Sequence, residues 1–162
     1  MQNGETPNYR KDPELLASTK HERYGHDTIG MVALDSQGSI ACGTTTNGAS
    51  YKIPGRVGDS PIMGAGAYCE SGVGGATQTG DGDQMMIFLP SFAAVNFMRQ
   101  GDSPTVACEK AVEPIRKFYP NASGALICLN AQGEWGGAKL NFESFSFSVR
   151  NADMDQVESV TI

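Results

Sequence analysis

Two helical segments stand in the middle of this 162-residue chain, and strand-like runs precede and follow them. The first segment covers residues 83–99, where we expect Pro90 to produce a kink. The second covers residues 103–119, in which Pro104 suits the first helical position and Pro114 predicts a second kink. This order predicts an α+β fold, with the helices packed on one face of an antiparallel sheet.

Short runs of β-branched and apolar residues mark the strands on either side of these helices. Residues 28–34 and 39–46, joined by a turn at 35–38, predict a β-hairpin. The other expected strands cover residues 67–70, 75–79, 124–129, 135–139 and 142–150. The strands that follow the helices are expected to form a meander.

A single domain spanning residues 28–150 accounts for this pattern. Residues 1–27 lack periodicity and carry no secretory signal, so we expect a linker or tail. The last residues, 151–162, are polar and are expected to be frayed. Hydrophobic residues make up 40% of the chain and charged residues 19%, which is typical of a globular protein rather than a disordered one.

The composition excludes several classes of partner. The net charge is −6 and lysine and arginine do not cluster, so nucleic-acid binding is not expected. No apolar run reaches the roughly 20 residues that span a bilayer, so no membrane partner is expected. None of the four cysteines shows the paired spacing of a zinc site, so no metal is expected.

Residues 25–30, GHDTIG, begin the first strand with a threonine placed directly after an aspartate. A threonine hydroxyl becomes a nucleophile when a base removes its proton, and the free α-amino group of the same residue can act as that base. Attack of Thr28 on the carbonyl of Asp27, followed by hydrolysis of the ester, would create this amine. Short motifs of this kind are also common at ordinary strand starts.

Two further groups bear on the same chemistry. The end of the second strand brings Thr46 toward Thr28 across the hairpin, where a second hydroxyl can orient the nucleophile. Nine of the 20 glycines lie between Gly55 and Gly82, a local cluster that predicts a site or loop. In this cluster Arg56 can bind a carboxylate and Asp59 an ammonium group. On its own, such a spacing is more typical of a surface ion pair.

The segment TGDGD at residues 79–83 leads from a strand into the first helix. The Thr79 hydroxyl and the Gly80 N–H are two donors that can hold a developing oxyanion. A helix N-terminus just beyond them favours negative charge. A simple strand-to-helix turn is the alternative interpretation.

Taken together, HDTIG, GTTTNG, GRVGDSPIMGAGAY and TGDGD, in this order and spacing, resemble the motifs of the glycosylasparaginases. These enzymes belong to the N-terminal-nucleophile hydrolase superfamily, and the resemblance covers residues 26–150. It implies the C-terminal, β-subunit half of an αββα sandwich. The amino-terminal half is absent here and would act in cis or in trans. The implied assembly is a heterodimer of the cleaved subunits, which can dimerise again.

The resemblance also implies a role for individual residues. Thr28 corresponds to the nucleophile freed by autoproteolysis after Asp27, and Thr46 to its supporting threonine. Thr79 and Gly80 correspond to the oxyanion hole. The implied substrate-binding residues are Arg56, Val57, Gly58, Asp59, Thr79, Gly80, Asp81 and Gly82.

The activity implied by the resemblance is cleavage of the amide between a sugar and asparagine, without a metal or organic cofactor. The implied location is the lysosome. Two alternatives remain open at this point. One is an L-asparaginase or β-aspartyl peptidase of the same superfamily, and the other is a truncated, inactive homologue.

Two covalent features complete the interpretation. The resemblance implies a disulfide between Cys108 and Cys128, with two buried free thiols as the alternative. Cys42 and Cys69 are expected to be small buried residues. Asn121 begins an Asn-Ala-Ser glycosylation sequon, which arises by chance about as often as by function.

Overall fold

The computed structural model describes residues 28–49 and 52–162. Its strands are β1 (Ile29–Leu34), β2 (Ile40–Thr45), β3 (Ala67–Glu70), β4 (Gly74–Gly80), β5 (Gly124–Asn130), β6 (Trp135–Leu140), β7 (Ser146–Val149) and β8 (Glu158–Thr161). Its helices are α2 (Gly82–Met85), the short 3-10 helix η2 (Met86–Phe88), α3 (Pro90–Arg99) and α4 (Pro104–Phe118). The expected linker at residues 1–27, which includes Asp27, lies outside the described residues.

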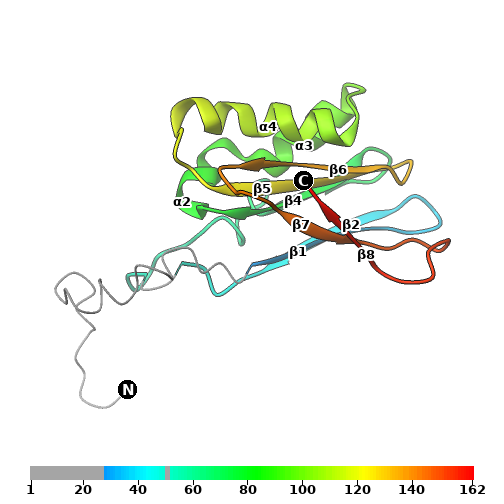
Figure 1. Cartoon of the computed structure of the whole chain (residues 1–162), viewed down its shortest axis with the longest axis horizontal. Coiled ribbons are helices and arrows are strands. Elements are labelled where there is room, and N and C mark those ends of the chain that lie inside the picture. The colour runs from blue at the N-terminus through cyan, green and yellow to red at the C-terminus, as the bar shows by residue number, and fades with distance from the viewer. Residues whose placement is uncertain (1–27, 50–51) are drawn as a thin grey trace, which may run out of the picture.

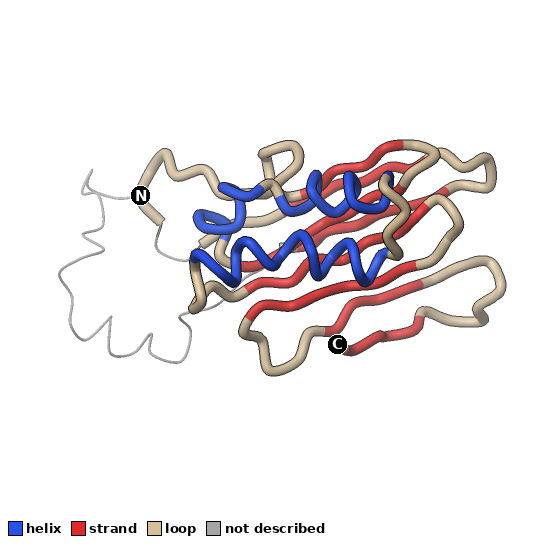
Figure 2. The backbone as a smooth tube through the Cα atoms, turned by 90° about the horizontal axis from the view of Figure 1, so that it is seen from above, coloured by secondary structure: helices blue, strands red, loops and turns tan. Residues whose placement is uncertain are grey.

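An antiparallel sheet in the order β3-β4-β5-β6 forms the middle layer of the molecule. Helices α3 and α4 cover one face of this sheet, as Figure 1 shows from the side and Figure 2 from above. The core between the two layers includes Val95, Val112, Ile115 and Leu126, all fully buried. Burial of each such side chain stabilises the fold by about 1.5–3 kcal/mol. The predicted α+β arrangement is confirmed.

The β1–β2 hairpin packs against the other face of the sheet (Figure 1). Side chains alternate along β1, as they do in any half-buried strand. Gly30 and Val32 are partly buried and point toward the sheet, whereas Ile29 and Met31 are each 65% exposed on the outer face. The hairpin therefore presents an apolar outer surface.

Two glycines let the hairpin approach the sheet closely. A Cβ atom on Gly30 would lie 2.1 Å from Thr77 Oγ1. A Cβ atom on Gly75 would lie 2.6 Å from Val32 Cγ1. Neither position has room for a larger residue, so the spacing of these two layers depends on both glycines.

The expected kinked helix at residues 83–99 is wrong. The chain breaks at Leu89, which adopts a left-handed conformation with φ 48° and ψ 55°, so that α2 and η2 end before α3 begins. Pro90 occupies the first position of α3. Proline fits there because its fixed φ is already helical and its missing N–H is not needed in the first turn.

Helix α4 follows the prediction more closely. It begins at Pro104 and continues through Pro114 to Phe118. Cys108 of this helix forms a disulfide with Cys128 of β5, with the Cα atoms 6.6 Å apart, so the implied bridge is confirmed. It closes a loop that should contribute about 3 kcal/mol. No helix in residues 28–49 and 52–162 is long and apolar enough to cross a membrane.

The C-terminal residues 151–162, expected to be frayed, include a strand. β8 pairs with β7, and Phe145 and Ile162 exchange backbone hydrogen bonds of 3.1 and 2.9 Å. Lys139 of β6 donates to the carbonyl oxygen of Ile162 at 2.8 Å. The residues of β8 are mostly exposed, so their polarity gave no strand signal, and backbone pairing orders them instead.

Candidate active site

The hydroxyl groups of Thr28 and Thr46 meet at the open end of the hairpin. The register pairs Ile29 with Thr45, so the next pair outward is Thr28 with Thr46. Their Oγ1 atoms are 3.0 Å apart, which is hydrogen-bond distance. The backbone N–H of Gly48 also donates to Thr46 Oγ1 at 2.8 Å, so the turn after β2 fixes this hydroxyl. The expected proximity of the two threonines is therefore present.

The register between the two layers brings Thr28 to the end of β4. Val32 packs against Gly75, and Gly30 packs against Thr77. The strands β1 and β4, which belong to different layers, therefore run in opposite directions. The same step of two residues on each strand leads from Gly30 to Thr28 and from Thr77 to Thr79. The start of β1 and the end of β4 therefore share one edge of the molecule.

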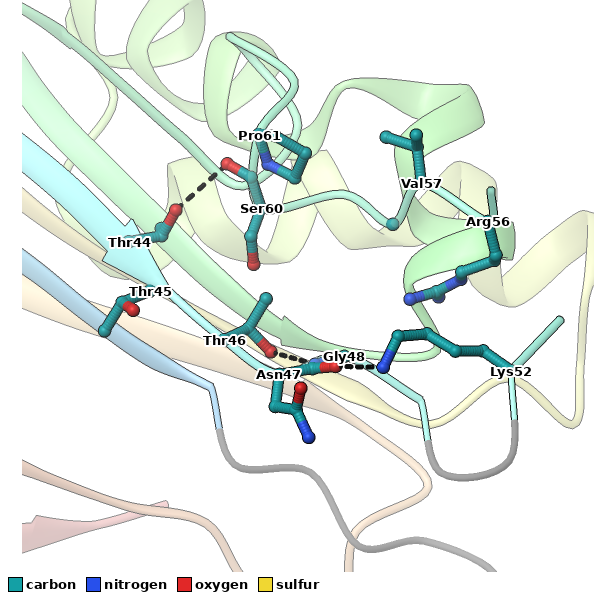
Figure 3. Close-up of a pocket in the computed structure, with 11 residues that line it drawn as sticks. Thr44, Thr45, Thr46, Asn47, Gly48, Lys52, Arg56, Val57, Ser60 and Pro61 are labelled. Carbon is teal, nitrogen blue, oxygen red and sulfur yellow. Dashed lines mark hydrogen bonds between the residues drawn. The ribbon is translucent and has the colours of Figure 1, made fainter. Parts of the chain in front are cut away.

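A cavity of about 410 Å³ opens beside Thr46 (Figure 3). Its lining residues are Thr44, Thr45, Thr46, Asn47, Gly48, Lys52, Arg56, Val57, Gly58, Ser60 and Pro61. In Figure 3 the side chains of Lys52 and Arg56 extend toward the side where Thr46 lies. The cavity thus combines two cationic side chains with a hydroxyl-rich wall.

Arg56 is held by an acidic residue and surrounded by glycines. Its Nε and Nη2 atoms each lie 2.9 Å from Asp83 Oδ1. A Cβ atom on Gly58, Gly48 or Gly82 would lie within 2.6, 2.8 or 3.2 Å of the guanidinium group, respectively. The absence of a side chain at these positions lets the guanidinium group lie directly against the backbone.

Asp59 also lies close to Gly82. It is only 7% exposed, and Gln78 Nε2 donates to its Oδ2 atom at 2.7 Å. A Cβ atom on Gly82 would lie 2.3 Å from Asp59 Oδ1 as well as close to Arg56. A guanidinium group and a carboxylate therefore flank one glycine, an arrangement suited to the carboxylate and ammonium groups of an amino acid.

Residues Thr79 to Gly82 connect β4 to α2. Gly80 has φ 144°, and its Cβ atom would lie 2.4 Å from Gly124 Cα, so glycine is required by both conformation and space. The backbone N–H of Asp81 donates to Ser123 O at 2.8 Å. These contacts with the start of β5 fix the strand end where the oxyanion donors are expected.

The structure thus gathers Thr28 with Thr46, and Arg56 with Asp59 and Gly82. Val57 lies at the cavity wall but is 57% exposed. In the part of the chain that is described, no group of three or more His, Cys, Asp and Glu side chains is placed to hold a metal ion.

Sequence reasoning missed three neighbours of these residues: Lys52, Gln78 and Asp83. Asp83 belongs to the TGDGD motif, so the sequence could have identified it as a site residue. The sequence does not identify Gln78, because its role depends on burial against Asp59. It does not identify Lys52 either, because the role of Lys52 depends on the path of a loop.

These layers define part of an α+β N-terminal-nucleophile hydrolase fold. The chain belongs to the asparaginase family, whose family model matches residues 2–159.

Curated relatives agree with this assignment. The N(4)-(beta-N-acetylglucosaminyl)-L-asparaginase of Mus musculus is 54% identical over 132 residues, which cover 80% of this chain and 38% of the mouse protein. The rat protein of the same name is 53% identical over 88% of this chain and 44% of its own length. A probable isoaspartyl peptidase/L-asparaginase 3 of Arabidopsis thaliana is 47% identical over 86% of this chain and 38% of its own length. The chain therefore spans about two-fifths of these relatives.

Proposed function

We propose that this chain carries the nucleophile and the substrate-binding residues of an amidohydrolase that cleaves the bond between N-acetylglucosamine and asparagine. The observation that carries the proposal is the 3.0 Å contact between the Thr28 and Thr46 hydroxyls beside the cavity that Arg56 lines. The names of the mouse and rat relatives support the sugar-linked substrate.

In this proposal the free α-amino group of Thr28 takes the proton from its own hydroxyl. The Thr28 oxygen then attacks the side-chain amide carbon of the asparagine, and the developing oxyanion is held by Thr79 and Gly80. The proton passes to the leaving nitrogen, and the glycosylamine departs. Water then hydrolyses the remaining ester and releases aspartate, which regenerates the hydroxyl.

Binding of the asparagine portion is assigned to the residues around Gly82. Arg56 binds the α-carboxylate, and Asp59 binds the α-ammonium group. Gly58 and Gly82 let the Arg56 and Asp59 side chains lie close to the backbone, while Val57 and Asp81 belong to the surrounding loop and strand end. The close approach of Arg56 and Asp59 to the Gly82 position supports this assignment.

In this proposal maturation is cleavage between Asp27 and Thr28, and we propose that it needs an amino-terminal half, which the family resemblance implies. The chain spans about two-fifths of the mouse and rat relatives, and Ile29 and Met31 form an apolar outer face on β1. A partner half that covers this face, as one subunit of a heterodimer, would bury it.

Thr28→Ala is the direct test of the nucleophile. In the full-length protein we expect the parent to yield a chain that begins at Thr28, detected by intact mass. The variant should yield neither this chain nor measurable release of the sugar, because both reactions use the same hydroxyl. Turnover at the parent rate by the variant would overturn the assignment.

A second candidate is hydrolysis of asparagine or of β-aspartyl dipeptides, which the Arabidopsis relative favours by its name. The same threonine would serve both reactions, and the substrates differ only beyond the scissile amide. Comparing kcat/KM for sugar-linked asparagine, free asparagine and isoaspartyl dipeptides separates the two. A higher kcat/KM for the dipeptide would replace the first proposal.

The lysosome is the location we propose from the family resemblance. Asn121 lies exposed in the turn before β5, which supports its use as a glycosylation site. Digestion with an N-glycosidase should increase the electrophoretic mobility of the protein from its native source. Unchanged mobility would contradict this modification.

A further inference from the structure

Gln78 is a buried residue of β4 to which the proposed reaction assigns no role. It is 3% exposed, and its Nε2 atom donates to Asp59 Oδ2 at 2.7 Å. Two residues away in each direction, Ala76 belongs to the core beneath the helices and Gly80 lies against Met85. Because alternate residues of a strand share a face, Gln78 approaches Asp59 from the helix side of the sheet.

We propose that Gln78 is a positioning residue that fixes the Asp59 carboxylate for the α-ammonium group of the substrate. This proposal rests on the role of Asp59 in the proposed function. The bond to Gln78 holds Oδ2, while Oδ1 is directed to Gly82, where a Cβ atom would lie 2.3 Å away. The carboxylate is therefore fixed on two sides, by Gln78 at Oδ2 and by the backbone of Gly82 next to Oδ1.

The amide group suits this task because it is a neutral donor. It fixes the carboxylate by a hydrogen bond and brings no positive charge that would compete with an ammonium group. The orientation of the amide is also determined. Turning it over would bring the Gln78 carbonyl oxygen against a carboxylate oxygen, and both atoms are acceptors.

The remaining amide atom argues against a purely stabilising role for this side chain. Gln78 Oε1 is buried and has no hydrogen-bond partner among the described residues. A buried acceptor without a partner disfavours folding, and an apolar residue of the same shape would avoid that penalty. The contact with Asp59 is the feature that such a replacement would lose.

Gln78→Met in the full-length, processed enzyme tests the proposal, because methionine keeps the length of the side chain and removes the donor. Steady-state kinetics are measured with sugar-linked asparagine and with the analogue that lacks the α-amino group. For the amino-bearing substrate we expect KM to rise about tenfold or more, with kcat within about twofold. For the deamino analogue, kcat/KM should be the same in variant and parent.

Two controls separate this role from a general loss of packing. Ser91→Ala removes another buried hydrogen bond, that of Ser91 Oγ to Ala65 O at 2.7 Å, and should leave KM for both substrates at the parent value. Gln78→Leu, an apolar replacement of different shape, should repeat the methionine result, and thermal melts identify the folded variants. Equal losses on both substrates, or an unchanged KM in a folded Gln78 variant, would overturn the proposal.

Asp59→Asn distinguishes failure of this proposal from failure of the proposed function. If Asp59 binds the ammonium group, the parent prefers the amino-bearing substrate and Asp59→Asn removes that preference. A parent without the preference overturns the role of Asp59, and the role of Gln78 with it. A preference that depends on Asp59 but not on Gln78 overturns the positioning role alone.

Discussion

At Gly82 a single missing methyl group leaves room for two charged side chains. The position of its absent Cβ atom is 2.3 Å from Asp59 Oδ1 and 3.2 Å from Arg56 Nη2. A side chain there would have to displace the buried Asp59 carboxylate and would occupy the space of the proposed substrate groups.

Gly82→Ala should therefore impair binding more than folding. We expect kcat/KM of the processed enzyme to fall about a hundredfold, mainly through KM, because the added methyl group displaces the groups that hold the amino acid. Gln132→Ala is the control, since Gln132 is exposed in the turn between β5 and β6. A parent-like KM in Gly82→Ala would contradict the assigned binding site.

The thiol of Cys42, which lies in β2, allows a test of the structure through its reactivity at a given pH. Burial, together with a hydrogen bond and charge interaction with Cys69, raises the pKa of the Cys42 thiol to about 12 from 9.0. Iodoacetamide should therefore label Cys42 slowly at pH 8 in the folded protein, because the thiolate is the reactive form. Peptide mapping measures the rate, and the urea-unfolded chain is the control. Equal rates in the two states would exclude the raised pKa.

The same shift has a consequence for stability. The unfolded thiol ionises near 9.0, whereas the folded one ionises near 12, so ionisation between these values favours the unfolded chain. The contribution of Cys42 is fully present below about pH 9 and is lost as the pH rises toward 12.

At the scale of elements, the disulfide connects the helix layer to the middle sheet. Replacing both Cys108 and Cys128 by serine should lower the free energy of unfolding by about 3 kcal/mol, because the unfolded chain regains the freedom of that loop. Denaturant titration measures the difference. Reduction of the parent should reproduce it, and equal stability of the two forms would argue against this contribution.

The strands were predictable because they are short apolar and β-branched runs bounded by turns, and β1 to β6 lie within a residue or so of their expected bounds. β7 covers only Ser146–Val149 of the strand expected at residues 142–150. The break at Leu89 could not be predicted from the sequence. Hydrophobic periodicity does not distinguish a proline that kinks one helix from a proline that begins a new helix. β8 could not be predicted either, because its exposed residues carry no hydrophobic pattern and only its pairing with β7 identifies it as a strand. The order of the motifs identified Arg56 as a candidate binding residue. Gln78 became a candidate only when the structure showed it buried against Asp59.

At the scale of the molecule, the outer face of the hairpin is an exposed apolar surface that a partner could cover. Ile29 and Met31 are each 65% exposed there. Met31→Gln should leave the sheet register intact but weaken assembly with the amino-terminal half, because it places a polar group in the proposed interface.

The fraction of full-length protein cleaved at Thr28 measures this assembly. Met63→Gln is the matched control, since Met63 is 82% exposed and belongs to the loop before β3 rather than to the outer face of the hairpin. We expect reduced cleavage in the Met31 variant and parent-like cleavage in the Met63 variant. Equal cleavage in both variants would argue against a partner on this face.

Gly30 and Gly75, which let the hairpin lie directly on the sheet, have a consequence for how such a chain can evolve. Any larger residue at either position would lift β1, and with it Thr28, away from the end of β4. The reach of the attacking oxygen is therefore limited from a distance, by two backbone positions that never touch the substrate. Substitutions at these two glycines should therefore reduce turnover more than they reduce the stability of the fold.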